Sequence, residues 1–263
     1  MNPARAVLLL AAVLLSGCAT RTRQTPTEVR RDGVVPALEQ PGLGTSWGEQ
    51  RESWVEPAIF ARASAERPTA QARTYYNDRD GADAMLAFLG GEPKRCEDLH
   101  QAAGGVRVGL RNANGGWLEC RESRGRHIAN ADHGSRYEVV LKNDARRAVE
   151  VLVSVDGLDA MDGKPASFKK RGYVLAPFET LAVEGFRTGA ATVAAFRFGS
   201  MFDSYGHRRH GNTVNAGVVG VAIFEEKRRP SAAEKSDQND HAWRSTATRP
   251  TGDRRDFSAP PEA

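Results

Sequence analysis

The second half of the chain alternates apolar and polar residues in short runs, a pattern that predicts β-strands. In Tyr137–Leu141 the apolar side chains occupy every second position, and Val149–Val155 repeats this arrangement. A period of two places these side chains on one face of a strand, where a core can cover them. Asn143 and Asp144 are typical of a turn and connect the two predicted strands.

Further short runs are rich in β-branched and aromatic residues and end at glycine, proline or polar turns. They are Val106–Leu110, Trp117–Cys120, Tyr173–Leu175, Leu181–Phe186, Val193–Phe198 and Val218–Phe224. The first two flank the turn sequence Asn112–Gly116, which predicts a hairpin. The last is apolar on both faces, so we expect a central strand. Strands without intervening helices predict a mainly β protein with a single antiparallel β-sandwich domain over residues 104–226.

The segment before these strands carries a helical pattern. Apolar residues between Ala82 and Leu89 form a short helix-like stretch that stops at Gly90–Gly91. Arg95–Ala103 is predicted to form a second short helix before the next glycine pair. We therefore assign residues 71–103 to a short helical segment at the N-terminal side of the β-domain.

The two ends of the chain are polar and contain many prolines. They lack a sustained apolar period, so we predict a flexible tether over residues 18–70 and a disordered C-terminal tail over residues 227–263. About 50 flexible residues have a root-mean-square span of about 40 Å. Four large apolar residues in the tether either pack onto the domain, the interpretation we favour, or form a docking site. They are Trp47, Trp54, Ile59 and Phe60.

Residues 1–17 show the three parts of a secretory signal in order. Arg5 supplies the positive start, Ala6–Leu15 is an apolar run, and the small residues Ser16–Gly17 precede Cys18. A signal peptide needs an apolar core of about 7–15 residues, whereas a membrane-spanning helix needs about 20. The run is too short to span a bilayer, and it predicts a signal peptide.

The string from Leu15 to Cys18 resembles the lipobox of bacterial lipoproteins. That resemblance implies cleavage before Cys18, diacylation of its thiol and acylation of the new amine, and several acyl chains give stable anchoring to a membrane. Because Ala19 rather than Asp follows, it also implies the outer membrane of a Gram-negative bacterium. The alternatives are an ordinary secreted protein or a cytosolic protein with an apolar N-terminus.

A second resemblance rests on short strings within residues 136–225. The strings are Ser154–Gly157, Gly172–Leu175, Ala194–Phe196, Asp203–Tyr205 and Gly217–Ala222. Their order resembles an uncharacterised family of bacterial β-rich proteins. The resemblance covers under half of the chain and implies a compact β-domain without an assigned activity. His207 and His210 depart from the pattern of that family.

Two cysteines remain once Cys18 is assigned to lipid. An even number in an oxidising compartment predicts a disulfide between Cys96 and Cys120. Closing a loop of this size contributes about 3 kcal/mol in the chain-entropy picture. The alternative is a pair of free, buried thiols that pack as small apolar groups.

Charge and motifs narrow the classes of function. The formal net charge is +4, and the basic residues are interleaved with acidic ones, so the chain does not carry the basic footprint of a nucleic-acid partner. No phosphate-binding glycine loop followed by Lys-Ser or Lys-Thr occurs, and no cofactor is expected.

Two groups of residues invite a metal or catalytic hypothesis. Asp203, His207 and His210 have side chains that suit zinc or copper, yet their spacing in a loop fixes no geometry, and no hydrolase signature surrounds them. A second group, Asp156, Asp159 and Asp162, suggests a calcium loop. Its period of three differs from the EF-hand spacing, so we favour ordinary Asx-turns. We therefore predict no metal ligand and no catalytic residue.

The leading hypothesis is a membrane-anchored envelope lipoprotein that acts as a non-enzymatic binding or scaffold module for an envelope protein or glycan. The long loop 199–216 is the predicted binding surface, because rigid sheets commonly present binding loops. Its contact residues are Phe202, Asp203, Tyr205, His207, Arg208, Arg209 and His210. An anionic glycan would be attracted by the basic residues of this loop and by Lys169–Arg171. The alternative is an envelope hydrolase or metal-dependent enzyme that uses Asp203, His207 and His210.

Overall fold

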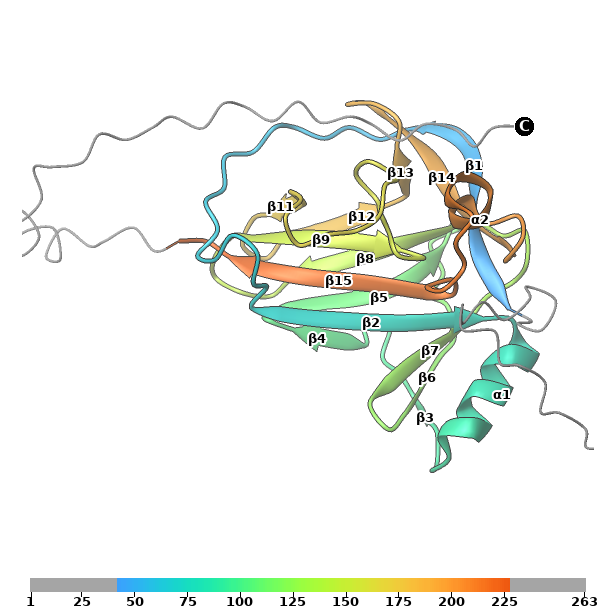
Figure 1. The fold of residues 1–263 in the computed structure, drawn as a ribbon. Helices are drawn as coiled ribbons and strands as arrows, with labels where there is room; N and C mark the ends of the chain where they lie inside the picture. Colours follow the sequence, from blue (N-terminus) through green and yellow to red (C-terminus); the bar gives the residue numbers. More distant parts are fainter. Residues whose placement is uncertain (1–41, 228–263) are drawn as a thin grey trace, which may run out of the picture. The chain divides into compact units, whose positions relative to one another are not determined.

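The computed structural model describes residues 42–227, which fold mainly into β-strands with two short helices (Figure 1). In chain order the elements are β1 Leu43–Glu52, β2 Ala70–Asn77, α1 Arg79–Leu89, β3 Lys94–Arg95, β4 Gln101–Ala103, β5 Val106–Asn112, β6 Cys120–Ser123, β7 Arg126–Asn130, β8 Tyr137–Asn143, β9 Val149–Val155, β10 Leu158–Asp159, β11 Tyr173–Leu175, β12 Thr180–Val183, β13 Gly185–Arg187, β14 Thr192–Ser200, α2 Tyr205–His210 and β15 Val218–Glu225. The predicted mainly β class is confirmed.

The strands form three sheets that share one hydrophobic core. The largest runs in the order β10-β9-β15-β2-β7-β6-β3, with β11 also paired to β9, and the others run β12-β8-β5-β4 and β1-β14-β13. Of the pairs between these strands, β2 with β7 is parallel and the rest are antiparallel. Strands of all three sheets contribute side chains to the core, which is the packing expected of a sandwich. Part of the outer face of the large sheet is covered, at β7 by α1, which packs on Ile128, and at β15 by Arg62, which lies over the ring of Phe224.

The two strands with the clearest alternation enter different sheets. β8 pairs with β5 and β12, whereas β9 pairs with β15, so the chain crosses the core between them. Asn143 makes this crossing, and its buried Nδ2 donates to the carbonyl oxygens of Arg147 and Ala176 at 2.8 and 2.9 Å. The predicted turn is therefore a connection between sheets.

β15 is the central strand that its apolar sequence predicts. It lies between β9 and β2, and Val221 faces Val153 on one side and Ala72 on the other. The predicted hairpin from Val106 to Cys120 forms only near its turn. Trp117 makes a single bridge to Arg111, after which the chain continues into β6 and pairs with β7.

The predicted tether is wrong over Leu43–Glu52, because this segment is strand β1 and pairs along β14. Its pattern is hard to read because few of its residues are apolar, yet Trp47 packs 4.7 Å from the ring of Tyr205. The packing interpretation holds for Trp47 and Phe60, which contact the domain, whereas Trp54 and Ile59 are exposed.

The helix predicted over Arg95–Ala103 is also wrong. Lys94–Arg95 pairs with β6, and Gln101–Ala103 pairs with β5. Tertiary strand pairing outweighs the local sequence signal here. The first predicted helix is confirmed as α1, which begins after the N-cap Asp78 and ends at Gly90, whose φ of 67° suits glycine.

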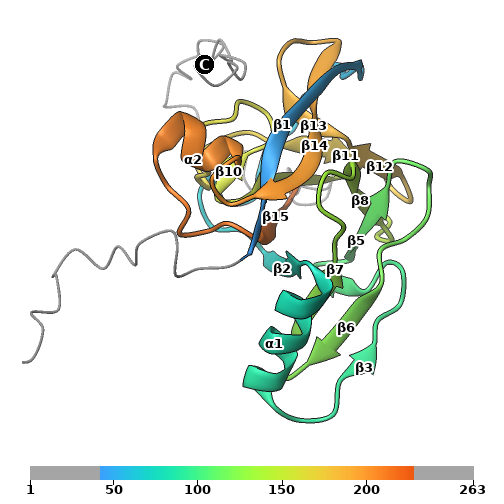
Figure 2. The same cartoon turned by 90° about the vertical axis from the view of Figure 1, so that its right-hand side faces the viewer.

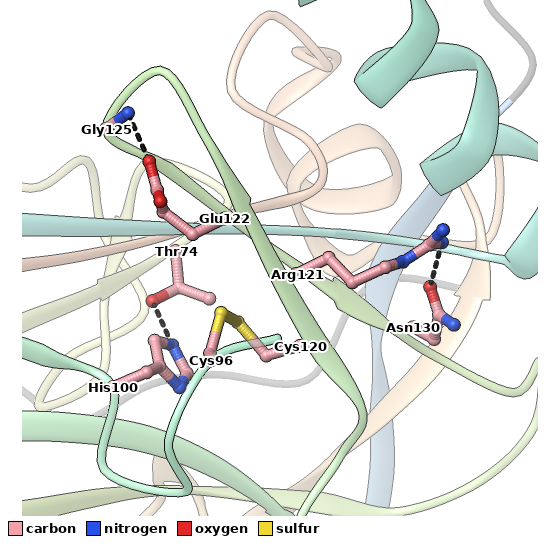
Figure 3. Close-up of a disulfide and its surroundings, with 8 residues drawn as sticks. All are labelled: Thr74, Cys96, His100, Cys120, Arg121, Glu122, Gly125 and Asn130. Atoms are coloured by element: carbon pink, nitrogen blue, oxygen red, sulfur yellow. Dashed lines mark hydrogen bonds between the residues drawn. A yellow bond between two sulfur atoms is a disulfide. The ribbon is translucent and has the colours of Figure 1, made fainter. Parts of the chain in front are cut away.

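The predicted disulfide between Cys96 and Cys120 is confirmed (Figure 3). The Cys96 backbone N–H donates to the Cys120 carbonyl oxygen at 2.9 Å, so the bridge continues the ladder of β3 and β6. Beside it, His100 bonds Thr74 at 3.2 Å and stacks on His127. Burial, reinforced by His127, lowers the pKa of His100 to about 4. Figure 2 shows this part of the molecule, where α1 lies beside β6 and β7.

Several predictions concern residues that the structure does not describe. The signal peptide, Cys18, the first part of the tether and all of the predicted C-terminal tail after Lys227 lie outside residues 42–227. Neither helix within the described range has the length and apolar character needed to cross a membrane.

Candidate functional site

The outer face of β2, β15 and β9 carries a groove of about 680 Å³, which we call the outer groove. Strand register sets its floor. Gly220 of β15 faces Arg73 of β2 on one side and Ser154 of β9 on the other, so these three residues form one row across the sheet. In the same way, Ala222 of β15 faces Gln71 of β2 and Leu152 of β9, and these three residues form the next row. The floor is therefore built from three strands that are distant in sequence.

Small side chains on the central strand leave open space above the floor of the groove. A Cβ atom at Gly220 would lie 2.8 Å from the Ser154 Oγ, so any larger residue there would crowd the middle row. Ala222 and Leu152 pack against Phe224 in a small apolar cluster at one end. The groove thus combines an open polar centre with an apolar end.

One wall of the outer groove is the segment Ala166–Phe168, and a buried ion pair holds it in place. Arg62 donates from Nε and Nη2 to the two carboxylate oxygens of Glu150 at 3.0 and 2.9 Å. The same guanidinium donates to the carbonyl oxygens of Phe168 and Lys170 at 2.7 and 2.5 Å. It also lies 3.6 Å from the ring centre of Phe224.

Glu150 is fully buried and satisfied from several sides. Besides Arg62, it accepts from the backbone N–H of Gly172 at 2.6 Å and pairs with Arg171 at 3.0 Å. A buried charge is tolerated when ion pairing and hydrogen bonds replace the water that it loses. This cluster therefore fixes the wall to the sheet.

The opposite wall, at Val214 and Asn215, depends on Asp156. Asp156 and Gly157 have φ angles of 53° and 80°, as a two-residue type I′ turn between β9 and β10 requires. The buried Asp156 carboxylate accepts from the Thr45 and Gly217 backbone N–H groups at 2.6 and 2.9 Å. It therefore ties β1 to the segment that leads into β15.

Asp156 also accepts the hydroxyl hydrogen of Tyr76 at 2.6 Å, and Tyr76 in turn bonds Thr45 at 2.7 Å. Thr45 reaches a second buried tyrosine, Tyr137, at 2.5 Å. Burial raises the pKa of Asp156 to about 6, although these hydrogen bonds favour its charged form. Within residues 42–227, the hydrogen-bond donors to this carboxylate are a hydroxyl and backbone N–H groups, so neutral donors stabilise its ionised form.

The three aspartates that suggest a calcium loop act as turn residues, the interpretation favoured from the sequence. Asp159 accepts from the backbone N–H of Met161 at 2.8 Å, and Asp162 accepts from that of Lys164 at 3.0 Å. Asp156 faces its own partners in the core. Among the described residues, no three metal-ligating side chains form a group that could hold an ion.

Two arginines lie at the β2 side of the outer groove. Arg73 is exposed, and Arg126 lies 5.7 Å above the ring of Tyr75 beside it. Within residues 42–227 neither arginine forms an ion pair. Asp159 also lines the groove; it lies 3.7 Å from Lys170, and burial raises its pKa to about 6. Among the described residues, no carboxylate is in ion-pair contact with Arg73, so its guanidinium is available to an anionic ligand.

The predicted binding loop 199–216 contains the short helix α2 and has one buried member among its seven predicted contact residues, Tyr205. Tyr205 is 2% exposed and packs on Trp47 and Phe186, so it cannot contact a partner. Ser204 caps α2 by accepting from the His207 backbone N–H at 3.2 Å. The exposed predicted contact residues are Phe202, Asp203, Arg208, Arg209 and His210, and His207 is partly exposed, so Tyr205 is the member that the structure removes from the predicted surface.

Asp203, His207 and His210 do not converge. Asp203 accepts from the Ser200 hydroxyl at 2.6 Å, and the His210 ring lies 3.0 Å from the Gly163 carbonyl oxygen. His207 instead contacts the ring of Phe202. The arrangement therefore provides neither a shared metal position nor a nucleophile beside a base.

The basic run Lys169–Arg171 is also occupied by partners. Lys170 pairs with Asp162 at 2.7 Å, and Arg171 pairs with Glu150. Lys169 lies 3.8 Å from Glu66. Arg73 and Arg126 are cations beside the groove that form no ion pair among the described residues, and they were not predicted because a lone arginine on a strand gives no distinguishing signal.

Comparison with models of known protein families, with curated proteins and with solved structures gives no match to this chain. The two resemblances drawn from short motifs therefore stay predictions.

Proposed function

We propose that this protein is a non-enzymatic binding module held at the bacterial envelope by lipid on Cys18, and that the outer groove is its ligand site. The observation that carries this proposal is the groove itself, in which a polar floor with the exposed Arg73 lies between two fixed walls. Binding sites of this kind combine a preformed concave shape with a few polar groups. The predicted binding loop 199–216 contributes Val214 and Asn215 to one wall of this groove, whereas Phe202 is not among the lining residues.

The rigidity of the groove supports binding. Its floor consists of paired strands, one wall is held by Arg62 and Glu150, and the other by Asp156. A preformed site loses little conformational entropy when a ligand enters, so more of the contact energy appears as affinity.

The first prediction concerns the lipid anchor on Cys18. Cys18→Ser removes the thiol that is acylated, so we expect the protein to move from the membrane pellet to the soluble fraction, as measured by immunoblotting after ultracentrifugation. Ser16→Ala is the control, because it keeps a small residue at the cleavage point and should remain in the pellet. Unchanged sedimentation of the Cys18→Ser protein contradicts the lipid anchor.

The outer groove makes the second prediction. A photo-crosslinking amino acid at Gln71, on the groove floor, is expected to give an adduct in living cells, and the same group at Gln50 on β1 is not. Ser154→Trp places a large side chain in the row formed by Arg73, Gly220 and Ser154, so it should block the groove and abolish the Gln71 adduct. The measurement is the mass shift of the protein after irradiation.

Folding of the Ser154→Trp protein is checked by its thermal unfolding midpoint, and Asn215→Trp, at the wall rather than on a strand, is a second blocking variant. If Gln71 gives no adduct, or gives one that both blocking variants leave intact, the outer groove is not the ligand site.

A further inference from the structure

The floor of the outer groove is a sheet face, so a ligand that lies on it meets mainly side chains. β15 is paired with β9 and β2, β2 is also paired with β7, and β9 is also paired with β10 and β11. The central strand β15 is paired on both sides, whereas β2 is paired with β7 only from Thr74 to Asn77. Recognition in the groove depends on what the side chains of the floor and walls provide.

This property separates two classes of elongated ligand. An extended peptide is commonly bound at a sheet edge, where its own N–H and C=O groups pair with a free strand. Over a sheet face these groups would lose water without gaining a regular set of partners, which is unfavourable. An oligosaccharide has no such backbone, since its polar groups are hydroxyls that single side chains can match.

The lining fits the two surfaces of a sugar ring. Gln71, Ser154 and Asn215 supply amide and hydroxyl groups that donate and accept hydrogen bonds. Phe168 and Val214 are partly or largely exposed apolar side chains on the two walls, and they can cover the C–H faces of the rings. Both kinds of contact are present within one groove.

Arg73 and Arg126 favour a negatively charged ligand. Arg73 lies in the middle row of the floor, and Arg126 stands over Tyr75 at the same side. A guanidinium binds a carboxylate through two parallel hydrogen bonds, which adds direction to the attraction. A ligand with carboxylates along its length would supply the negative charge that these arginines lack.

We infer that the outer groove binds an acidic oligosaccharide, with one carboxylate on Arg73 and sugar rings against Phe168 and Val214. This inference rests on the proposed function, because it takes the groove to be the ligand site. It specifies acidic oligosaccharides as the class of envelope component that the groove binds, in addition to the membrane contact made by the lipid anchor.

The test is calorimetric titration of the full-length protein in detergent micelles with two probes, oligomers of galacturonic acid and oligomers of hyaluronan. We expect at least one probe to bind, and Arg73→Gln to weaken that binding about tenfold or more. Lys94→Gln removes the same charge from exposed β3 and should change the affinity less than about twofold. Neutral methyl-ester forms of the probes are expected to bind as weakly as the probes bind the Arg73→Gln protein.

Three outcomes overturn the inference. Neither probe binds; or a probe binds with an affinity that Arg73→Gln and Ser154→Trp leave unchanged; or a glutamate-rich peptide binds in the groove and both sugars fail. In each case the crosslinking experiment from Gln71 tests the proposed binding function independently of the sugar inference. A groove adduct that contains protein keeps the binding function and rejects the sugar.

Discussion

Arg62→Ala is expected to lower the free energy of unfolding by about 3–5 kcal/mol, because it leaves the carboxylate of Glu150 buried without its main partner. Arg171 remains near that carboxylate, but its side chain is 36% exposed and it makes a single close contact with Glu150. Three carbonyl oxygens, those of Ala65, Phe168 and Lys170, also lose this donor. The measurement is urea-induced unfolding followed by circular dichroism.

Arg51→Ala is the matched control for this change. Arg51 lies 3.7 Å from Glu184, with side chains 39% and 23% exposed, and pairs that keep contact with solvent contribute about 0–1 kcal/mol. Equal losses for the two variants would show that the buried pair contributes no more than a surface pair. Because Arg62 holds the wall at Phe168, its loss should also weaken groove binding in protein that remains folded.

Strand identity could be predicted where one side of the strand is regularly apolar. The alternation in Val149–Val155 and the doubly apolar run of β15 both lead to correct elements, because burial on one face or two imposes those patterns. β1 has no such regularity. Its polar residues Glu49 and Gln50 are exposed, and its place is decided by pairing with β14, which lies more than a hundred residues away.

The site was harder to predict than the fold for a related reason. The row Arg73, Gly220 and Ser154 exists only after three distant strands align, so no local motif marks it. The loop around Tyr205 shows the opposite error. An aromatic residue among cations looks like a contact surface, yet Tyr205 is the anchor by which α2 packs on Trp47. Composition indicates which groups are present and leaves open which way they face.

The buried Asp156 gives the other large expected effect. Asp156→Ala leaves the donors of Thr45, Gly217 and Tyr76 without an acceptor and places alanine at a positive φ, so we expect a loss of at least about 3 kcal/mol in the free energy of unfolding at neutral pH. Asp156→Asn should lose less, since asparagine tolerates this φ and keeps one acceptor oxygen. Urea titrations of the three proteins measure the difference.

The same carboxyl predicts a dependence on pH. Its pKa is about 6 in the folded protein, above the ordinary value of 3.8, because burial penalises the charge. Between these values the folded state holds a proton that the unfolded state releases, so this group makes the protein less stable as the pH rises from about 4 to about 6. The stability of the wild type relative to Asp156→Asn should therefore fall across that range and then level off.

Comparing the wild type with the variant removes the contributions of other groups. Asp159 acts in the same direction, with a pKa of about 6, whereas His100, with a pKa lowered to about 4, makes the protein more stable as the pH rises. Asp144→Asn is a control of opposite sign, because Arg107 lowers the pKa of Asp144 in the folded protein. Its difference from the wild type should grow with rising pH at the acid end. If the Asp156→Asn difference rises with pH instead, the hydrogen bonds from Tyr76 and the two backbone N–H groups outweigh burial, and Asp156 is held ionised.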